Sequence, residues 1–247
     1  MRLFTMVAAE LRETLTRPRR LLGVLSPSLV ARSLRAKRVQ WLASGAWTIG
    51  AGGVAVKQFK SYDDYVRVQQ SKLQHLDLGA HEAQFRAVLR DRLAASGVVA
   101  PGARVLCLGA RLGGEVAAFR DLGAFAVGVD LNPGPDNAWV MFGDFQQLQF
   151  PDGVVDVVYS NSLDHAFDLT RMMAEVGRVL TADGRLVVEA DPGAEDAGAV
   201  APDLWASLQW PTVDALAAQI LACGFVLVTR SNFAYPRGGT SLVFRKP

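Results

Sequence analysis

The stretch Val105-Leu-Cys-Leu-Gly-Ala-Arg-Leu-Gly-Gly-Glu-Val116, followed by Ala126-Val-Gly-Val-Asp130, decides the fold of this 247-residue chain. Its first four residues are an apolar run short enough for a buried parallel strand. Gly109 then permits a tight turn into a helix that we expect to open near Gly113 or Gly114. Asp130 ends a second strand, from which a carboxylate can accept ribose hydroxyls. The order strand, glycine turn, helix, strand, acid predicts a nucleotide-binding half-site.

Further short apolar segments continue this alternation. We expect a third strand from Trp139 to Met141, leading into Phe142-Gly-Asp-Phe-Gln146. The run Phe150-Pro-Asp-Gly-Val-Val-Asp-Val-Val-Tyr-Ser-Asn161 predicts a fourth strand with a polar end. A helical segment from Met172 to Leu180 and the stretch Thr181-Ala-Asp-Gly-Arg-Leu-Val-Val-Glu189 complete the later units. Strands that alternate with helices predict an α/β protein with a parallel sheet.

The combined motifs resemble the class I S-adenosylmethionine-dependent methyltransferases, especially the group with the type 11 methyltransferase domain. The resemblance is strong from about Gly102 to Ala190 and looser in the C-terminal segment. It rests on Gly-Val-Asp, Gly-Asp-Phe, Phe-Pro-Asp and Glu-Val-Gly-Arg-Val-Leu-Thr-Ala-Asp-Gly, which occur in the family's order and approximate spacing. It implies a Rossmann-like, seven-stranded, mostly parallel sheet with one antiparallel strand, preceded here by an N-terminal helical extension. It also implies S-adenosyl-L-methionine as cofactor and methyl transfer as the reaction.

The resemblance further implies which residues hold the methyl donor. Gly109 and Gly113 match the first and last glycines of the methionine-binding loop, and Asp130 matches the ribose-binding acid. Asp144 and Phe145 match the acid and the apolar neighbour beside adenine. The polar end of the fourth strand lies where the family closes the site. The residues expected to bind the donor are therefore Gly109, Ala110, Arg111, Gly113, Asp130, Leu131, Asp144, Phe145, Ser160 and Asn161.

Two residues of the donor loop depart from the family pattern. Cys107 replaces the acidic residue usual in the first strand, and Arg111 stands where a middle glycine is usual. The arginine side chain either turns outward or pairs with a carboxylate of the ligand, and the sequence leaves both open. These departures sustain an alternative function, a catalytically inactive donor-binding regulatory or partner protein.

A nicotinamide dehydrogenase uses the same arrangement of strand, turn and acid, but it predicts other residues as well. A short-chain dehydrogenase has a tyrosine with a lysine four residues later, and no tyrosine of this chain has one. The loop also lacks the full Gly-x-Gly-x-x-Gly series that admits a pyrophosphate. The sequence therefore favours the methyl donor over a dinucleotide.

His165 is the best-placed candidate for a catalytic base, because it follows the fourth strand, where the crevice of such a sheet lies. Asp164 is expected to orient this histidine or the donor's amino group. A wall or helix-start position for His165 is the alternative. The other histidines, His75 and His81, and the cysteines Cys107 and Cys223 give no convincing metal-ligand set.

The acceptor class is bounded but not identified. The net charge is only +2, so the chain as a whole has no electrostatic case for nucleic acid. Ser160-Asn-Ser-Leu163 also replaces the Asn/Asp-Pro-Pro-aromatic motif usual in amino-methylating nucleic-acid enzymes. We expect a small-molecule, glycan or lipid-linked acceptor and no nucleic-acid partner.

Three segments are expected along the chain: a basic N-terminal extension at 1–60, a helical lid at 61–98 and the donor-binding domain at 99–247. Nine lysines and arginines precede Gly45 against only Glu10 and Glu13. A solvated helical extension is the favoured interpretation, and peripheral membrane contact or an acidic partner is the alternative. The uncharged Trp41 to Val56 is shorter than the ~20 residues of a membrane span, so we expect a linker or docking segment and a cytoplasmic protein.

The lid and the C-terminal segment supply candidates for ligand contact and the last strands. Ser61 is expected to cap the first lid helix. We expect a helix from Val213 to Cys223 and two antiparallel strands, Phe225 to Thr229 and Ser241 to Phe244. The candidates for contact with donor or acceptor are Tyr62, Tyr65, Gln69, Lys72, Trp205, Trp210 and Pro211.

Overall fold

The computed structural model describes residues 34, 37, 39–41, 43–74, 79–135, 137–199, 201–235 and 238–246, with only the backbone at 74 and 79–81. Internal contacts divide the chain into two units, Met1–Ser44 and Gly45–Pro247. This division falls earlier than the boundary predicted after residue 60. The described residues of the first unit are mainly helical. Most of the basic segment, with its predicted membrane or partner contact, lies outside the described residues.

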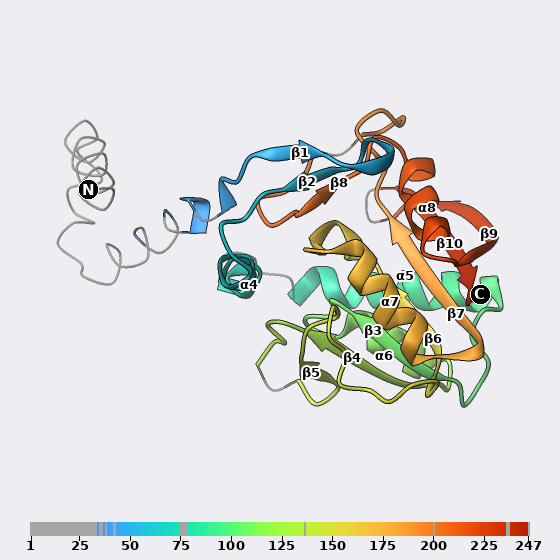
Figure 1. Cartoon of the computed structure of the whole chain (residues 1–247). Coiled ribbons are helices and arrows are strands. Elements are labelled where there is room, and N and C mark those ends of the chain that lie inside the picture. Colours follow the sequence, from blue (N-terminus) through green and yellow to red (C-terminus); the bar gives the residue numbers. More distant parts are fainter. Residues whose placement is uncertain are drawn as a thin grey trace, which may run out of the picture. The chain divides into compact units, whose positions relative to one another are not determined.

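A seven-stranded sheet forms the centre of the second unit (Figure 1). The strand order is β5 (Val140–Phe142), β4 (Phe125–Asp130), β3 (Arg104–Leu108), β6 (Val155–Ser160), β7 (Leu180–Ala190), β10 (Gly239–Arg245) and β9 (Val226–Phe233). In this order, the first five strands pair in parallel. The sixth, β10, runs antiparallel to both of its neighbours, β7 and β9. The predicted mostly parallel, seven-stranded sheet with one antiparallel strand is therefore confirmed.

Helices cover both faces of this sheet, and β3 shows why. Val105 and Cys107 pack with side chains of α5 and α6, whereas Leu106 and Leu108 pack with side chains of α7 and α8. Successive side chains of a strand point to opposite faces, so the continuous apolar run of β3 serves two cores at once. The result is a three-layer α/β/α unit. The helices are α5 (Gly79–Ser96), α6 (Gly114–Asp121), α7 (Leu169–Val179) and α8 (Val213–Ala222).

The lid segment contains α4 (Tyr62–Gln70) and the short helix η2 (Lys72–Gln74) before α5. Ser61 Oγ accepts a hydrogen bond from the backbone N–H of Asp64 at 3.1 Å, which confirms the predicted cap of α4. Within the described part of the chain, no helix is both long and apolar enough to cross a membrane.

Of the two interpretations of Trp41 to Val56, a linker or a docking segment, the linker is wrong. This segment contains β1 (Trp47–Ile49), η1 (Ala51–Gly53) and the start of β2 (Ala55–Lys57). The two strands form a small antiparallel sheet with β8 (Leu208–Gln209), seen above α4 and α7 in Figure 1. Two glycines of η1 have positive φ, so the residues that weaken a helix here make the turn of a hairpin.

We expect Leu106→Ala to lower the free energy of unfolding by about 2 to 5 kcal/mol, because this side chain is fully buried in the core beneath α7 and α8. The control is Leu221→Ala on α8, where the leucine is 42% exposed, and its effect should stay within about 0.5 kcal/mol. Denaturant unfolding followed by circular dichroism measures both. Equal losses in the two variants would contradict the assignment of Leu106 to the core.

Candidate active site

The carboxyl ends of β3 and β6 meet at a point where the chain changes direction across the sheet. From β3 it proceeds to β4 and β5 on one side, and then crosses back to β6 on the other side. Gly109, directly after β3, has φ 73, and a Cβ placed on it would lie 2.7 Å from Ser162 Cβ. Both the positive φ and this close approach require glycine. Ligands of open α/β sheets bind in the crevice at such a point.

Asp130, at the end of β4, holds the loop that follows β3. Its Oδ2 accepts a hydrogen bond from the backbone N–H of Arg111 at 3.0 Å, and its Oδ1 accepts one from Asn132 at 2.7 Å. Each carboxylate oxygen keeps a further lone pair for a ligand hydroxyl. With Leu131 and Phe145, Asp130 lines a narrow pocket beneath the lid, so these three predicted residues are brought together.

Arg111 has φ 38 and is the only described residue other than glycine with positive φ. Its carbonyl accepts hydrogen bonds from Gly134 N at 3.1 Å and Asn137 Nδ2 at 3.0 Å. The residue lines both the narrow pocket and a larger cavity beside it. Of the two orientations that the sequence leaves open, the structure shows the inward one.

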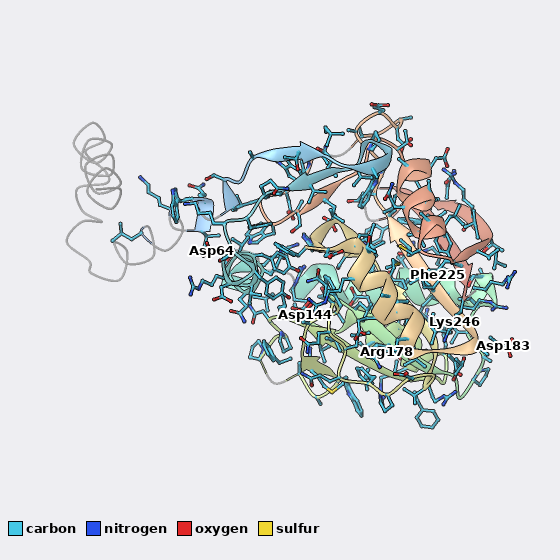
Figure 2. All side chains as sticks on the ribbon, viewed as in Figure 1. Asp64, Asp144, Arg178, Asp183, Phe225 and Lys246 are labelled. Carbon is cyan, nitrogen blue, oxygen red and sulfur yellow. The ribbon has the colours of Figure 1, made fainter. Side chains whose placement is uncertain are left out.

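Asp144 follows β5 and lies next to α4 (Figure 2). The Tyr62 hydroxyl donates a hydrogen bond to its Oδ2, and Gln146 N donates to its Oδ1 at 2.8 Å. Burial, followed by the hydrogen bond to Asp144, raises the pKa of the Tyr62 phenol. The lid helix therefore contacts the acid predicted to lie beside adenine.

Four of the predicted donor-binding residues line neither cavity: Ala110, Gly113, Asp144 and Ser160. Ala110 is buried in the core, and Gly113 is the N-cap of α6 with φ 87. Ser160 is fully buried, where its Oγ donates to Leu108 O at 3.2 Å and accepts from Ser162 N at 3.1 Å. Ser162, which sequence reasoning did not select, lines both cavities instead. Ser162 lies beyond the end of β6, where the strand alternation no longer applies, so the sequence alone did not tell which of the two serines lines a cavity.

The larger cavity, called the main cavity below, has a volume of about 630 Å³. Aromatic side chains from α5, the segment before β8, and the β9–β10 connection form part of its wall. Trp205 lines it as expected, whereas Trp210 lines a smaller neighbouring cavity and Pro211 lines neither. The ionisable residues lining the main cavity include Lys72, Glu82, Arg111, Glu115, Asp164, His165, Glu189, Asp191 and Asp203.

His165, in the short helix η3 (Leu163–His165), forms a buried pair with Lys72 from the lid. Lys72 Nζ lies 2.6 Å from His165 Nε2, and His165 Nδ1 lies 3.2 Å from Trp205 O. A carbonyl oxygen only accepts, so Nδ1 carries the proton and Nε2 presents its lone pair to Lys72. Burial lowers the pKa of both side chains.

Two carboxylates flank this pair. Asp164 Oδ2 lies 3.6 Å from His165 Nε2, and Asp203 Oδ2 lies 3.4 Å from Lys72 Nζ. With the ring proton on Nδ1, Nε2 has no hydrogen to donate to Asp164, so the predicted role of Asp164 in orienting His165 stays a prediction. Two lid residues also donate hydrogen bonds to this part of the site. Tyr65 Oη donates to His165 O at 3.0 Å, and Gln69 Nε2 donates to Trp205 O at 2.7 Å.

In the described part of the chain, no three His, Cys, Asp or Glu side chains are grouped so as to hold a metal ion. His75 and the side chain of His81 lie outside that part. Cys107 is fully buried in β3, and Cys223 follows α8 as its C-cap.

A known protein family matches the part of the chain that contains β6 and most of β3. Residues 106–188 match the family model Methyltransf_11, described as a methyltransferase domain. This part of the chain is a methyltransferase domain. The matched residues run from β3 into β7 and contain the crevice. The predicted methyltransferase domain is confirmed for these residues.

Solved structures share the fold. A Burkholderia thailandensis 1,6-didemethyltoxoflavin-N1-methyltransferase, with bound 1,6-didemethyltoxoflavin and S-adenosylhomocysteine, gives a TM-score of 0.62 at 21% identity over 81% of this chain and 97% of that chain. The putative methyltransferase complex with the Haloferax volcanii Trm112 activator gives 0.53 at 19% identity over 67% and 97%. The [4+2]-cyclase SpnF gives 0.53 at 19% identity over 65% and 81%. Comparison with curated proteins gives no match.

The geometry of the Lys72–His165 pair predicts the protonation state of the histidine at pH 7. His165 should be neutral and carry its proton on Nδ1, because burial lowers its pKa and Trp205 O accepts from that nitrogen. Nitrogen-15 NMR of histidine-labelled protein distinguishes the two neutral forms and the cation. Substitution His165→Gln identifies the signal by its loss. A charged ring, or a proton on Nε2, would refute the arrangement.

Proposed function

We propose that this chain transfers a methyl group from S-adenosylmethionine to a small molecule held in the main cavity. The observation that carries this proposal is the cavity itself, which adjoins Gly109 and Arg111 and reaches the Lys72–His165 pair. Its volume of about 630 Å³ lies within the range of roughly 300 to 1,000 Å³ typical of small-molecule sites. A glycan or lipid-linked acceptor would place only its terminal group there.

The residues of the crevice fit the donor. Gly109 leaves bare backbone at the closest approach of β3 and β6, and Asp130 keeps lone pairs for ribose hydroxyls. Asp144 and Phe145 follow β5, where adenine is expected to lie. Arg111 points inward and can pair with the donor's carboxylate. When bound, S-adenosylmethionine supplies a methyl group already activated by its sulfonium.

Lys72 and His165 are proposed as the proton acceptors for a hydroxyl or amine nucleophile. A lone pair of the acceptor bonds to the methyl carbon, and the acceptor's proton must then leave. The lowered pKa values of Lys72 and His165 make an uncharged member of the pair accessible near neutral pH. The proton then rests on Nζ or Nε2, and the nearby Asp203 and Asp164 stabilise the resulting cation.

Two proteins of similar structure bear on the reaction. The Burkholderia protein is named as a methyltransferase of a small heterocycle, which supports a small acceptor here. SpnF is named as a cyclase on the same fold, so the fold alone does not assign methyl transfer. The departures at Cys107 and Arg111 keep a donor-binding protein without methyl transfer as the alternative. Cytoplasmic localisation and peripheral membrane contact stay predictions from the sequence.

Two measurements on the full chain test the proposal. Calorimetric titration with S-adenosylmethionine, S-adenosylhomocysteine and NAD should show binding of the first two alone. Incubation of donor carrying an isotope-labelled methyl group with a low-molecular-mass extract should then label a small compound. Donor binding without labelled product from any extract would support the inactive alternative. Failure of all three ligands to bind folded protein would remove the donor site.

Asp130→Asn should weaken S-adenosylhomocysteine binding by at least about tenfold, because it removes the charge that strengthens hydrogen bonds to ribose. The amide also cannot accept at both positions from Arg111 N and Asn132 N, so the loop should lose stability as well. The control is Asp183→Asn at an exposed position of β7, which should bind like the parent. Calorimetry measures affinity, and unchanged affinity in Asp130→Asn would reject the ribose assignment.

With an acceptor in hand, His165→Gln and Lys72→Met should each lower kcat by about 10²- to 10⁴-fold, as expected for loss of a base. In the parent, the rate should rise with pH as the pair loses its proton, and the lowered pKa values place that rise below the ordinary lysine range. The variants should lose this limb of the profile. A reduced rate with an unchanged pH profile would assign the pair a positioning role only.

A further inference from the structure

Glu115 is a buried carboxyl group that the proposed reaction does not use. It lies in the first turn of α6 with only 7% of its surface exposed, and it lines the main cavity. Asn161 Nδ2 donates a hydrogen bond to its Oε1 at 3.3 Å. Its Oε2 is buried and has no hydrogen-bond partner among the described residues. A buried polar oxygen left unpaired costs free energy, so this atom points to a ligand.

Glu82 brings a second carboxylate to the same place from a different helix. Its Oε2 accepts a hydrogen bond from the backbone N–H of Gly114 at 3.1 Å, at the start of α6. Glu82 also lines the main cavity. Two acids from α5 and α6 therefore face one end of the cavity, next to Asn161.

The surroundings hold Glu115 in its neutral form. Burial first, and then the charge of Glu82, raise the pKa of Glu115 to about 8, against smaller opposing effects of its own backbone N–H, Arg111 and Asn161. The other ionisable groups that sense its charge are uncharged, because burial raises the pKa of Cys107 in β3 and of Tyr159 in β6. Among the described residues, Arg111 is the cation whose charge lowers the pKa of Glu115.

We propose that Glu115 and Glu82 form a subsite for a primary ammonium group of a ligand in the main cavity. An ammonium offers three N–H donors and a positive charge, so it can fill the vacant acceptor position of Glu115 Oε2 and offset both carboxylates. A neutral hydroxyl would satisfy one oxygen but would not stabilise the ionised form of Glu115. The subsite deepens the proposed function and rests on it.

An ammonium group has two sources here, the amino acid part of the donor or an amine-bearing acceptor. Binding of either changes the protonation of Glu115 in the same direction. At pH 7 a carboxyl with a pKa of about 8 is mostly protonated, and an ammonium favours its ionised form. Binding should therefore release about 0.9 proton per ligand at pH 7 and almost none above about pH 9.

The experiment is calorimetry of the full chain at pH 7 and pH 9.5 in two buffers of different ionisation enthalpy, which counts the protons released. S-adenosylhomocysteine is compared with 5′-methylthioadenosine, which keeps the nucleoside and sulfur but lacks the amino acid part. Benzylamine is then compared with benzyl alcohol on protein saturated with S-adenosylhomocysteine. Each titration is repeated with Glu115→Gln, which keeps the shape and the contact to Asn161, and its proton count is subtracted.

If the donor supplies the ammonium, only S-adenosylhomocysteine releases the Glu115 proton, and Glu115→Gln weakens it by about tenfold or more while methylthioadenosine is unaffected. If the acceptor supplies it, benzylamine but not benzyl alcohol gives these effects. Glu82→Gln should reduce the release at pH 7 in either case, because loss of the like charge lowers the pKa of Glu115 before binding. A purely structural Glu115 would not produce this pattern.

Equal proton counts for parent and Glu115→Gln, with methylthioadenosine and S-adenosylhomocysteine both bound, would overturn the ammonium subsite and leave the proposed function standing. Failure of both nucleosides to bind would instead overturn the proposed function, and the subsite with it.

Discussion

The site depends on the close approach of two backbone segments, at Gly109 after β3 and at Ser162 after β6. An added Cβ at Gly109 would lie 2.7 Å from the Ser162 side chain, a distance that real Cβ atoms do not tolerate. This contact joins the two strands between which the sheet changes direction, and it brings the narrow pocket and the main cavity to a common edge. The ligand surface around it consists of backbone on one side and ionisable side chains on the other.

Burial of charge gives this surface its chemistry. The lid brings Lys72 to within 2.6 Å of His165, and α5 brings Glu82 next to the start of α6. Each group costs desolvation energy, and for Lys72 the contact with Asp203 at 3.4 Å offsets only part of that cost. The ionisable groups therefore respond by changing their proton affinity, with bases lowered at one end and an acid raised at the other. A ligand that supplies the missing partners recovers part of that cost.

The strands and helices of the matched domain were predictable because their signal is local. The apolar run before Gly109 and the acid at Asp130 can each be recognised from a few neighbouring residues. The helix α6 begins one residue after Gly113, as expected. The hairpin of β1 and β2 was missed because its partner β8 lies far along the chain, and a two-residue strand carries no periodicity. Short strands that pair only at long range leave little trace in local sequence.

The candidate site shows the same limit at the level of single residues. His165 and Asp164 could be selected from their place after the fourth strand, but the contact of His165 with Lys72 spans 93 positions. Ser160 and Ser162 have the same chemistry, but Ser160 is buried at the end of β6, whereas Ser162 follows the strand and lines both cavities. Glu115 carried no signal, since an acid in the first turn of a helix is ordinary; only its burial and its unpaired oxygen distinguish it.

Arg111 departs from the glycine that is usual in the family, and it lines both cavities. A non-glycine residue at φ 38 costs on the order of 1 to 3 kcal/mol and persists only where neighbours fix it. Here the backbone N–H is held by Asp130, and the carbonyl is held by Gly134 and Asn137. Glycine would adopt this backbone without strain, but it would bring no charge to a cavity lined by several carboxylates. The strained backbone of Arg111 therefore places a guanidinium at the junction of the two cavities. The carboxylate that holds the Arg111 backbone is Asp130, which is also expected to bind ribose.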